Sequence, residues 1–359
     1  MQTAGPPHGA KAPWAGTDVH TTAGPSSSAA APRVKIQRVP VHGVLLLDKP
    51  LGLSSNQALQ KAKWLLRAEK AGHTGTLDPL ATGVLPLCFG AATKFSQQHL
   101  DADKTYETTV RLGVRTSTAD AEGEVLERHP VQCSAGQLVE VLDRFMGPIE
   151  QIPPMHSALK KDGKALYEYA RAGHTVERAA RSVLIHELEL LEFELRGDAP
   201  FMRLRVHCSK GTYIRTLGED IGAALGCGGH LVALRRVQTG PFSVERCVTL
   251  EALEAMDPSQ RGQALLPIEC LLPGYASVVL DNADAARFLS GLRRRGQWPD
   301  RDEVCVYGEQ PRAFLGSGHV KGGELIPGRL LSPIEIQHIL ANSPQDQQGL
   351  AKQASRRFA

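Results

Sequence analysis

A short loop with an aspartate directly before a proline is the stretch of this sequence best suited to chemistry. The loop runs from Gly72 to Pro86, and Asp78 precedes Pro79 within it. Proline fixes its own φ and disfavours helix at the residue before it, so Asp78 is expected to be extended, with its carboxylate held in one direction. Such a carboxylate can act as a nucleophile or in acid–base catalysis. The alternative is a turn in which the aspartate only bonds its own backbone.

Four more side chains are candidates for the same site, although each also has an ordinary structural explanation. Tyr106 stands in an alternating stretch, where a tyrosine commonly fills the core. Tyr213 and Arg215 are two residues apart, so in an extended segment they share a face, and such an arginine can pair with a carboxylate. The alternative for Arg215 is a surface position at the start of a helix. His73 lies five residues before Asp78 and is otherwise isolated.

A basic and aromatic segment at about 151–180 does not have the pattern of a core. We expect it to project from the fold, where lysines can contact a phosphate backbone and tyrosines can stack on bases. A solvated charged loop is the alternative. Together with two arginines of a later strand, the residues predicted to contact a phosphate backbone are Lys160, Lys161, Lys164, Arg235 and Arg236.

The elements that must position these residues alternate between strands and helices. Apolar or alternating runs predict strands at 43–47, 84–89, 104–113, 182–194, 202–209 and 231–237. Capping residues and periodic apolar residues predict helices from Ser54 or Ser55 to about Ala68, at 134–146 and from about 215 to 225. The expected fold class is α+β, with a mixed, largely antiparallel sheet core and flanking helices.

The chain is predicted to contain two domains between two terminal segments. Residues 39–273 form the first domain, which includes the insertion at about 151–180. Short strands and Gly- and Pro-rich turns predict a small β-rich domain at 274–333. Residues 1–38 are rich in Ala, Pro, Gly, Ser and Thr and are predicted to be disordered, and 334–359 are predicted to be a loose C-terminal tail.

Composition limits the possible partners and cofactors. The 359 residues are 42% hydrophobic, contain no apolar run long enough to span a membrane, and carry a formal net charge of +3. That charge is already present in residues 1–38, so a polyanionic partner must meet a local basic patch. Seven scattered cysteines without a C-x-x-C pair argue against structural zinc and suit a reducing cytoplasm. Since no nucleotide-binding motif occurs either, we predict no metal site and no cofactor.

In combination, these segments resemble the bacterial TruB-type tRNA pseudouridine synthase family over about residues 40 to 255. The segments that carry the resemblance are Gly43–Pro50 with Gly52-Leu53-Ser54-Ser55, Gly72–Pro86, Lys104-Thr105-Tyr106, Ile152–Tyr169, Cys208–Leu217 and Gly229–Arg236. The β-rich domain resembles the PUA-type RNA-binding module of that family. The insertion matches the one that grips the T loop of tRNA in relatives.

The resemblance implies an isomerase that converts the T-loop uridine at tRNA position 55 to pseudouridine without a cofactor. The base is extruded into the pocket, its N1–C1′ bond breaks, and C5 is joined to C1′. By the same resemblance Asp78 is the nucleophile, Arg215 its ion-pair partner, and Tyr106 stacks on the target base. Tyr213 shapes the pocket, Leu234 forms its wall, and His73 lies beside the gap that the extruded base leaves.

Two other hypotheses remain open from the sequence. One is a non-catalytic tRNA-binding or folding module, which would have no need of a buried ionised carboxylate. The other is a guide-dependent pseudouridine synthase, although the long insertion favours stand-alone recognition. The expected partner is the T-arm of tRNA. We expect a cytoplasmic monomer with no membrane association and no protein partner.

Overall fold

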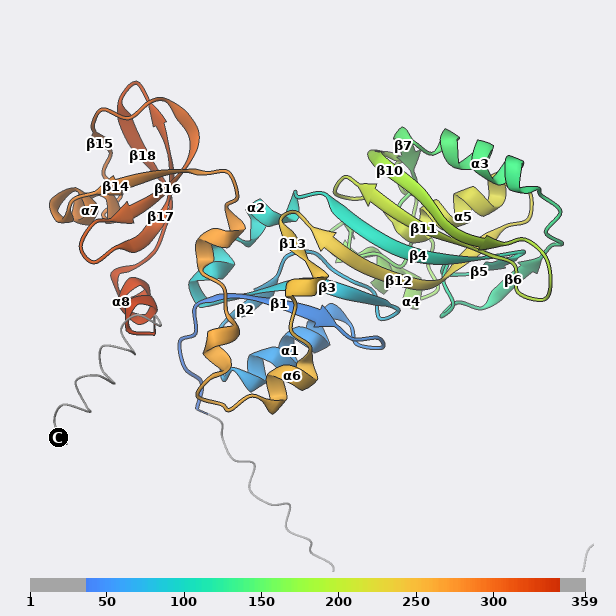
Figure 1. The fold of residues 1–359 in the computed structure, drawn as a ribbon, viewed down its shortest axis with the longest axis horizontal. Coiled ribbons are helices and arrows are strands. Elements are labelled where there is room, and N and C mark those ends of the chain that lie inside the picture. The colour runs from blue at the N-terminus through green and yellow to red at the C-terminus, as the bar shows by residue number, and fades with distance from the viewer. Residues whose placement is uncertain (1–36, 343–359) are drawn as a thin grey trace, which may run out of the picture. The chain divides into compact units, whose positions relative to one another are not determined.

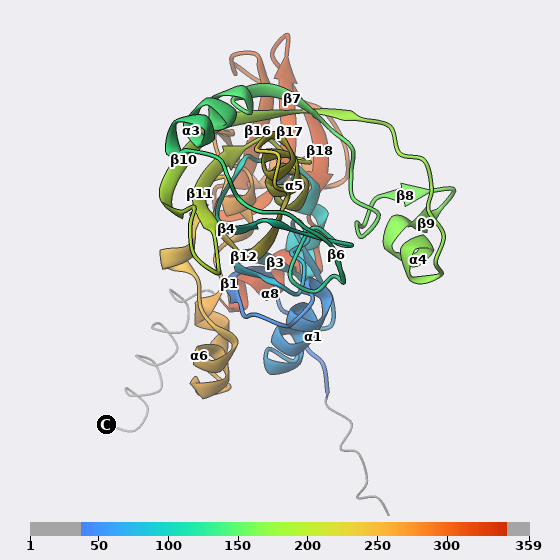
Figure 2. The ribbon, with the colours of Figure 1, turned by 90° about the vertical axis from the view of Figure 1, so that its right-hand side faces the viewer.

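The computed structural model describes residues 37–342 (Figures 1 and 2). The predicted disorder of residues 1–38 and the end of the predicted tail therefore lie largely outside the described residues. Among the described helices, none is long and apolar enough to cross a membrane.

A nine-stranded mixed sheet forms the centre of the larger part of the chain. Its main path runs β1-β3-β12-β4-β11-β10-β7, with β2 paired to β3 and β13 paired to β12. Every pairing is antiparallel except that of β12 with β3, which confirms the predicted sheet type. The strands are β1 Gly43–Lys49, β2 Ala71–His73, β3 Ala81–Phe89, β4 Lys104–Leu112, β7 Gly147–Gln151, β10 Arg181–Glu194, β11 Phe201–Cys208, β12 Gly229–Thr239 and β13 Phe242–Ser243.

The helices around this sheet begin at the predicted caps. Ser54 caps α1 and Ser134 caps α3, each in a capping box with the glutamine three residues later. Both helices end before the predicted residues Ala68 and Met146, because the last residues leave helical geometry. The helices of this part are α1 Ser55–Leu65, α2 Ser96–Leu100, α3 Ala135–Arg144, α5 Ile214–Ala224 and α6 Leu250–Ala255.

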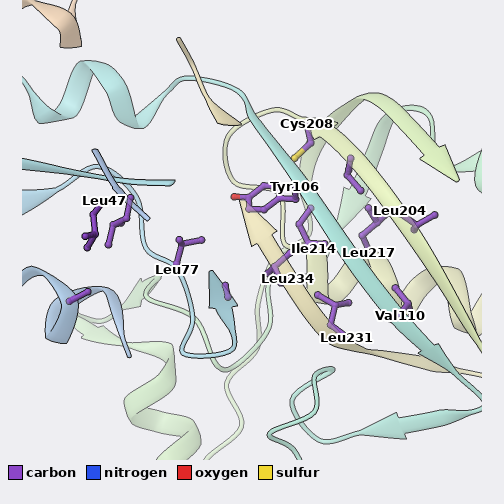
Figure 3. Packing of buried hydrophobic residues seen from close by; sticks show 14 of the residues in the cluster. Leu47, Leu77, Tyr106, Val110, Leu204, Cys208, Ile214, Leu217, Leu231 and Leu234 are labelled. Carbon is purple, nitrogen blue, oxygen red and sulfur yellow. The ribbon is translucent and has the colours of Figure 1, made fainter. Parts of the chain in front are cut away.

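Helix α5 packs closely against β12. A Cβ added at Gly222 would lie 2.4 Å from the backbone nitrogen of Gly229, so this face of the helix can approach the strand so closely only with glycine there. On β4 the burial alternates residue by residue, as predicted, and Val110 joins Leu231 in one apolar core. Figure 3 shows this cluster continuing along β4 to Tyr106, beside Leu234 and Ile214.

The insertion is a small unit of its own between β7 and β10. It contains the short hairpin β8 Lys160–Lys161 and β9 Lys164–Ala165, followed by α4 Leu166–Arg171. Figure 2 shows these elements standing away from the main sheet, as the sequence predicted. A second hairpin pairs β5 Val114–Thr116 with β6 Val125–Arg128.

The β-rich part after Pro273 is a five-stranded sheet with the order β14-β16-β17-β18-β15. Its elements are β14 Ala276–Leu280, α7 Asn282–Leu289, β15 Arg294–Arg295, β16 Arg301–Gly308, β17 Ala313–Lys321, β18 Glu324–Leu330 and α8 Pro333–Ala341. The prediction of a loose tail at 334–359 is wrong for its first residues, because these form the helix α8. Ser332 and Glu335 form its capping box, and Ile336 packs on the core.

A second apolar core contains residues from both sheets. The rings of Phe95 and Phe314 have their centres 5.4 Å apart, and Leu271 and Leu331 belong to the same buried cluster. Lys94 reinforces the contact, because its Nζ lies 2.7 Å from Glu335 Oε2. The β-rich part is therefore packed on the residues that precede it.

Candidate active site

A cavity of about 530 Å³ is lined by six of the predicted site residues. Its lining comes from segments that are far apart in the sequence: the loop before β3, the strands β4 and β12, the insertion, and the turn into α5. The predicted residues that line it are Asp78, Tyr106, Tyr213, Arg215, Leu234 and Arg236. The fold thus brings together side chains whose common position the sequence pattern alone does not reveal.

An ion pair between Asp78 and Arg215 lies in the cavity. Arg215 Nε is 2.9 Å from Asp78 Oδ2, and the side chain of Asp78 is 37% exposed whereas that of Arg215 is 5% exposed. Arg215 also donates from Nη1 to Thr118 O at 3.1 Å and from Nη2 to His156 O at 2.6 Å. Its guanidinium is therefore fixed, with one edge presented to the Asp78 carboxylate.

Burial and the arginine act in opposite directions on the pKa of Asp78. Burial raises this pKa above its ordinary value, and the charge of Arg215 and its hydrogen bond lower it. Arg215 thus offsets part of the penalty that burial places on the ionised carboxylate. Asp120 works against ionisation of Asp78 because it is a second nearby carboxylate.

Asp120 is a buried residue of the site that the sequence analysis missed. Its Oδ2 lies 3.7 Å from Arg215 Nη1, and its Oδ1 accepts hydrogen bonds from the Thr118 hydroxyl and from Glu122 N. Arg215 therefore lies between two carboxylates, one facing the cavity and one in the protein interior. The interior carboxylate compensates the buried guanidinium and holds it in place.

Tyr106 reaches the cavity from β4. Burial raises the pKa of its hydroxyl, so the phenol stays protonated at neutral pH. Arg236 lies in the same wall of the cavity and is only 1% exposed. Its Nε donates to Val84 O at 2.7 Å, and its side chain also interacts with Tyr106. The prediction that Arg236 contacts an RNA backbone is therefore wrong, because this arginine is enclosed by the protein.

Two buried lysines add positive charge around the cavity. Lys49 Nζ donates to Pro50 O at 2.8 Å, and its pKa is lowered to about 8 by burial, with Asp78 acting in the opposite direction. Lys104 lines the cavity and donates to Leu100 O at 2.8 Å, and burial lowers its pKa to about 8. Neither lysine was identified from the sequence as a site residue.

The turn into α5 is held by a side-chain amide. Gln151 Oε1 accepts from Tyr213 N at 3.0 Å, and Gln151 Nε2 donates to Tyr213 O at 3.2 Å. This pair of bonds joins the end of β7 to the residue before α5. It sets the direction in which Tyr213 and Arg215 leave the backbone.

Comparison with known proteins identifies the family. Residues 63–214 match the TruB family pseudouridylate synthase N-terminal domain, and residues 215–273 match the tRNA pseudouridylate synthase B C-terminal domain. A tRNA pseudouridine synthase B from Verminephrobacter eiseniae is 62% identical over 320 residues, covering 88% of this chain and 97% of that protein. The chain belongs to the TruB family of tRNA pseudouridine synthases. It is therefore an isomerase, and the resemblance found in the sequence is confirmed.

Other similar proteins agree with this assignment. A tRNA pseudouridine synthase B from Ralstonia pickettii is 60% identical over 306 residues, covering 83% of this chain and 96% of that protein. Among solved structures, a chain of a Cbf5-Nop10-Gar1 complex has a TM-score of 0.60 and 27% identity, with 84% of this chain and 87% of that chain covered. The α+β fold with a β-rich C-terminal part is thus shown by both sequence and structure.

The remaining predicted residues of this TruB-family chain lie outside the cavity. His73 is in β2 and does not line the cavity; its Nδ1 is buried without a hydrogen-bond partner among the described residues, and burial lowers its pKa. Arg235 is paired with Asp48, with 2.7 Å between Nη2 and Oδ2. Its side chain is 40% exposed, but its charge is already compensated by Asp48, which weakens its predicted role at a phosphate.

The three predicted lysines lie together on the insertion. Lys160 is exposed on β8. Lys161 Nζ donates to Glu177 O at 2.9 Å, and Lys164 Nζ lies 4.8 Å from the ring centre of Tyr169. None of these three lysines is paired with a carboxylate in the described residues, so they form the basic part of the insertion.

Proposed function

We propose that this chain converts the T-loop uridine at tRNA position 55 to pseudouridine, acting without a guide RNA and with Asp78 as the nucleophile. The observation that carries the proposal is the Asp78–Arg215 ion pair, at 2.9 Å, in a cavity that Tyr106 also lines. A fixed guanidinium beside a carboxylate favours the ionised form of the nucleophile and opposes the effect of burial. A non-catalytic binding module has no use for that arrangement.

The chemistry proposed for the cavity is an isomerisation that needs no external reactant. The target uridine leaves its stack and enters the cavity, where Asp78 attacks the nucleotide and the N1–C1′ bond breaks. The base turns over, C5 bonds to C1′, the bond that Asp78 formed is broken again, the proton at C5 is lost, and N1 gains a proton. Tyr106 stacks on the base during these steps, and Tyr213 and Leu234 limit its orientations.

Recognition is assigned to the insertion and to the β-rich part. The lysines of the β8–β9 hairpin and the tyrosines of α4 offer charge and stacking surfaces on one projecting unit. We propose residues 39–273 as the catalytic domain, with the insertion at about 151–180, and 274–333 as a PUA-like RNA-binding domain. The latter adds contacts outside the loop and so raises affinity for whole tRNA.

Pseudouridine mapping tests the proposed substrate. Purified protein is incubated with unmodified tRNA, without added guide RNA, and pseudouridine is mapped by carbodiimide-based primer extension. We expect a single stop that reports position 55. A tRNA whose T-loop uridine is replaced by cytidine is the control and should give no stop. Modification that requires an added guide RNA would favour the guide-dependent alternative, and no modification at all would favour a binding module.

RNA binding is predicted to weaken steeply with salt and to depend on the insertion. Removing the cation that neutralises one phosphate should reduce the slope of log K against log salt by about 0.7 to 0.9. We therefore expect Lys160→Ala, Lys161→Ala and Lys164→Ala in one chain to lower this slope by about 2. Fluorescence anisotropy with a T-arm stem-loop at several salt concentrations measures the slope.

Lys61→Ala provides the matched control for the lysine variants. Lys61 is also a surface lysine, but its charge is paired with Glu254 at 3.1 Å. Its removal is expected to leave the slope unchanged. An affinity of the wild-type chain that does not change between low and moderate salt would contradict phosphate-dominated binding.

A chain that ends at Pro273 is predicted to be active on a T-arm stem-loop but to melt at a lower temperature and to bind whole tRNA more weakly. The cavity residues all precede this boundary. Truncation removes Phe314 and Leu331 from the second apolar core and exposes Phe95, which explains the lower melting temperature. Calorimetry comes first, and the activity assay is then run below the melting temperature. Cooperative melting without single-turnover activity would show that the C-terminal part contributes to the active site.

A further inference from the structure

A cluster of two histidines and an aspartate lies outside the catalytic cavity and is not used by the proposed reaction. Asp103 directly precedes β4, His186 is in β10 and His207 is in β11. One ligand atom from each residue lies within 4.8 Å of the other two, and in the described part of the chain these residues form the only group of this kind. Their positions, 103, 186 and 207, give no motif that a sequence pattern detects.

The backbone holds the three side chains together. The pairing of β10 with β11 shifts between Ile185 and Glu187, so that Glu187 lies opposite His207 and His186 is an extra residue on the bulged strand. Bulges of this kind change the direction of a side chain. The backbone of Asp103 is held by a hydrogen bond, in which its carbonyl oxygen accepts from Gly240 N at 2.9 Å.

The contacts within the cluster do not use every nitrogen and oxygen atom that could bind a metal. His186 Nε2 lies 3.2 Å from Asp103 Oδ2, yet this buried nitrogen has no hydrogen bond of acceptable geometry among the described residues. The rings of His186 and His207 have their centres 4.7 Å apart. Two imidazoles and a carboxylate thus lie close enough together to serve as ligands of one cation.

We infer that Asp103, His186 and His207 bind one divalent transition-metal ion of the zinc class. Two imidazole nitrogens and one carboxylate oxygen form a ligand set that Zn²⁺ accepts with tetrahedral geometry, with water in the fourth position. Bonds of about 2.0 to 2.2 Å require ligand atoms about 3.4 Å apart, so the three ligand atoms, now within 4.8 Å of one another, would move closer together on binding.

The metal would join two segments that border the catalytic cavity. Asp103 is followed by Lys104, and His207 is two residues before Ser209; both Lys104 and Ser209 line the cavity. The ion would thus fix the start of β4 to the β10–β11 pair beside the active site. Since an ion that binds only the folded state stabilises it, the melting temperature should rise with metal concentration.

Metal binding by the full-length chain tests this inference. The protein is treated with a chelator and dialysed, and ZnCl₂ is added in competition with a chromophoric indicator. We expect one equivalent to bind and the melting temperature to rise. CoCl₂ is the spectroscopic probe: visible d–d bands without a near-ultraviolet thiolate band indicate nitrogen and oxygen ligands, which separates this site from the seven free cysteines.

His186→Gln and His207→Gln are the variants that decide the question. Loss of a residue that only hydrogen-bonds a metal ligand weakens metal binding by about 10- to 100-fold, so loss of a ligand itself should weaken it at least as much. His129→Gln is the matched control, because His129 Nε2 also lies close to a carboxylate, 3.0 Å from Glu127 Oε2, but forms no such three-ligand group with other residues that the structure describes. It should bind like the wild type.

The expected result is loss of the bound equivalent and of the metal-dependent rise in melting temperature in both glutamine variants, but not in the control. All three variants should retain pseudouridine formation in the absence of metal, which separates this inference from the proposed function. Unchanged metal binding in both His186→Gln and His207→Gln would overturn the inference. So would a cobalt spectrum dominated by a thiolate band, or equal loss in His129→Gln.

Discussion

Asp78→Asn is expected to abolish pseudouridine formation while leaving RNA binding largely intact. The amide keeps the shape of the side chain but has no nucleophilic oxygen of comparable strength. Removal of an enzyme's nucleophile costs on the order of 10⁴-fold or more in rate. Because the carboxylate is 37% exposed and burial raises its pKa, loss of its charge should change stability far less than activity.

Single-turnover assays with excess enzyme measure the chemical step for this variant without the effect of product release. Asp302→Asn is a suitable control, since it makes the same substitution at an exposed position on β16. Anisotropy with the T-arm stem-loop then shows whether binding is preserved. Appreciable pseudouridine formation by Asp78→Asn would remove Asp78 from the nucleophile's role.

The local elements of this fold were largely predictable because their signals are local. Ser134 and Gln137 predict the start of α3, and the alternation from Lys104 predicts β4, since each depends on neighbours in sequence. The same kind of signal was present and missed at α8. Ser332 and Glu335 form a capping box there, with a proline at the first position of the helix.

The error at Arg236 also has a physical reason. Arg235 and Arg236 are adjacent on β12, and neighbouring residues of a strand point to opposite faces. Only one of them can therefore lie on the solvent side, and the structure places Arg236 inside with its Nε on Val84 O. The prediction from the sequence used charge alone and therefore placed both arginines at the surface.

Other parts of the site depend on contacts that a sequence does not contain. Asp120 reaches Arg215 across 95 positions, and Gln151 reaches Tyr213 across 62. Neither residue stands in a motif, and each is a common residue type in a loop or at a strand end. The family resemblance identified the side chains expected to carry the chemistry, whereas the residues that hold them in place appeared only when the strands were assembled.

Arg215→Met is expected to reduce the chemical step strongly and also to destabilise the fold. Loss of the guanidinium leaves Asp78 without its counter-charge, so less of the carboxylate is ionised and the rate should fall about 10²- to 10³-fold. It also leaves Asp120 buried without its cation, and breaking such a pair costs about 3 kcal/mol. Single-turnover rates and thermal melting measure the two effects separately.

A second substitution distinguishes catalysis from folding in this variant. Arg215→Met with Asp120→Asn removes the unpaired buried charge, so the melting temperature should recover in part while the rate stays low. Full recovery of the rate would mean that Arg215 acts only through stability. If Arg215→Met instead lowers RNA affinity and leaves the single-turnover rate unchanged, the ion pair does not serve the chemistry.

The cycle with Asp78→Asn gives the most direct test of the pairing. Side chains that act through one interaction are not additive, so Arg215→Met should have little further effect on the residual rate once Asp78 is an amide. Independent roles would instead multiply the two losses. Because Arg215 is held by Thr118 O and His156 O as well as by the carboxylates, its orientation should survive Asp78→Asn, and the cycle then reports on the charge of Asp78 alone.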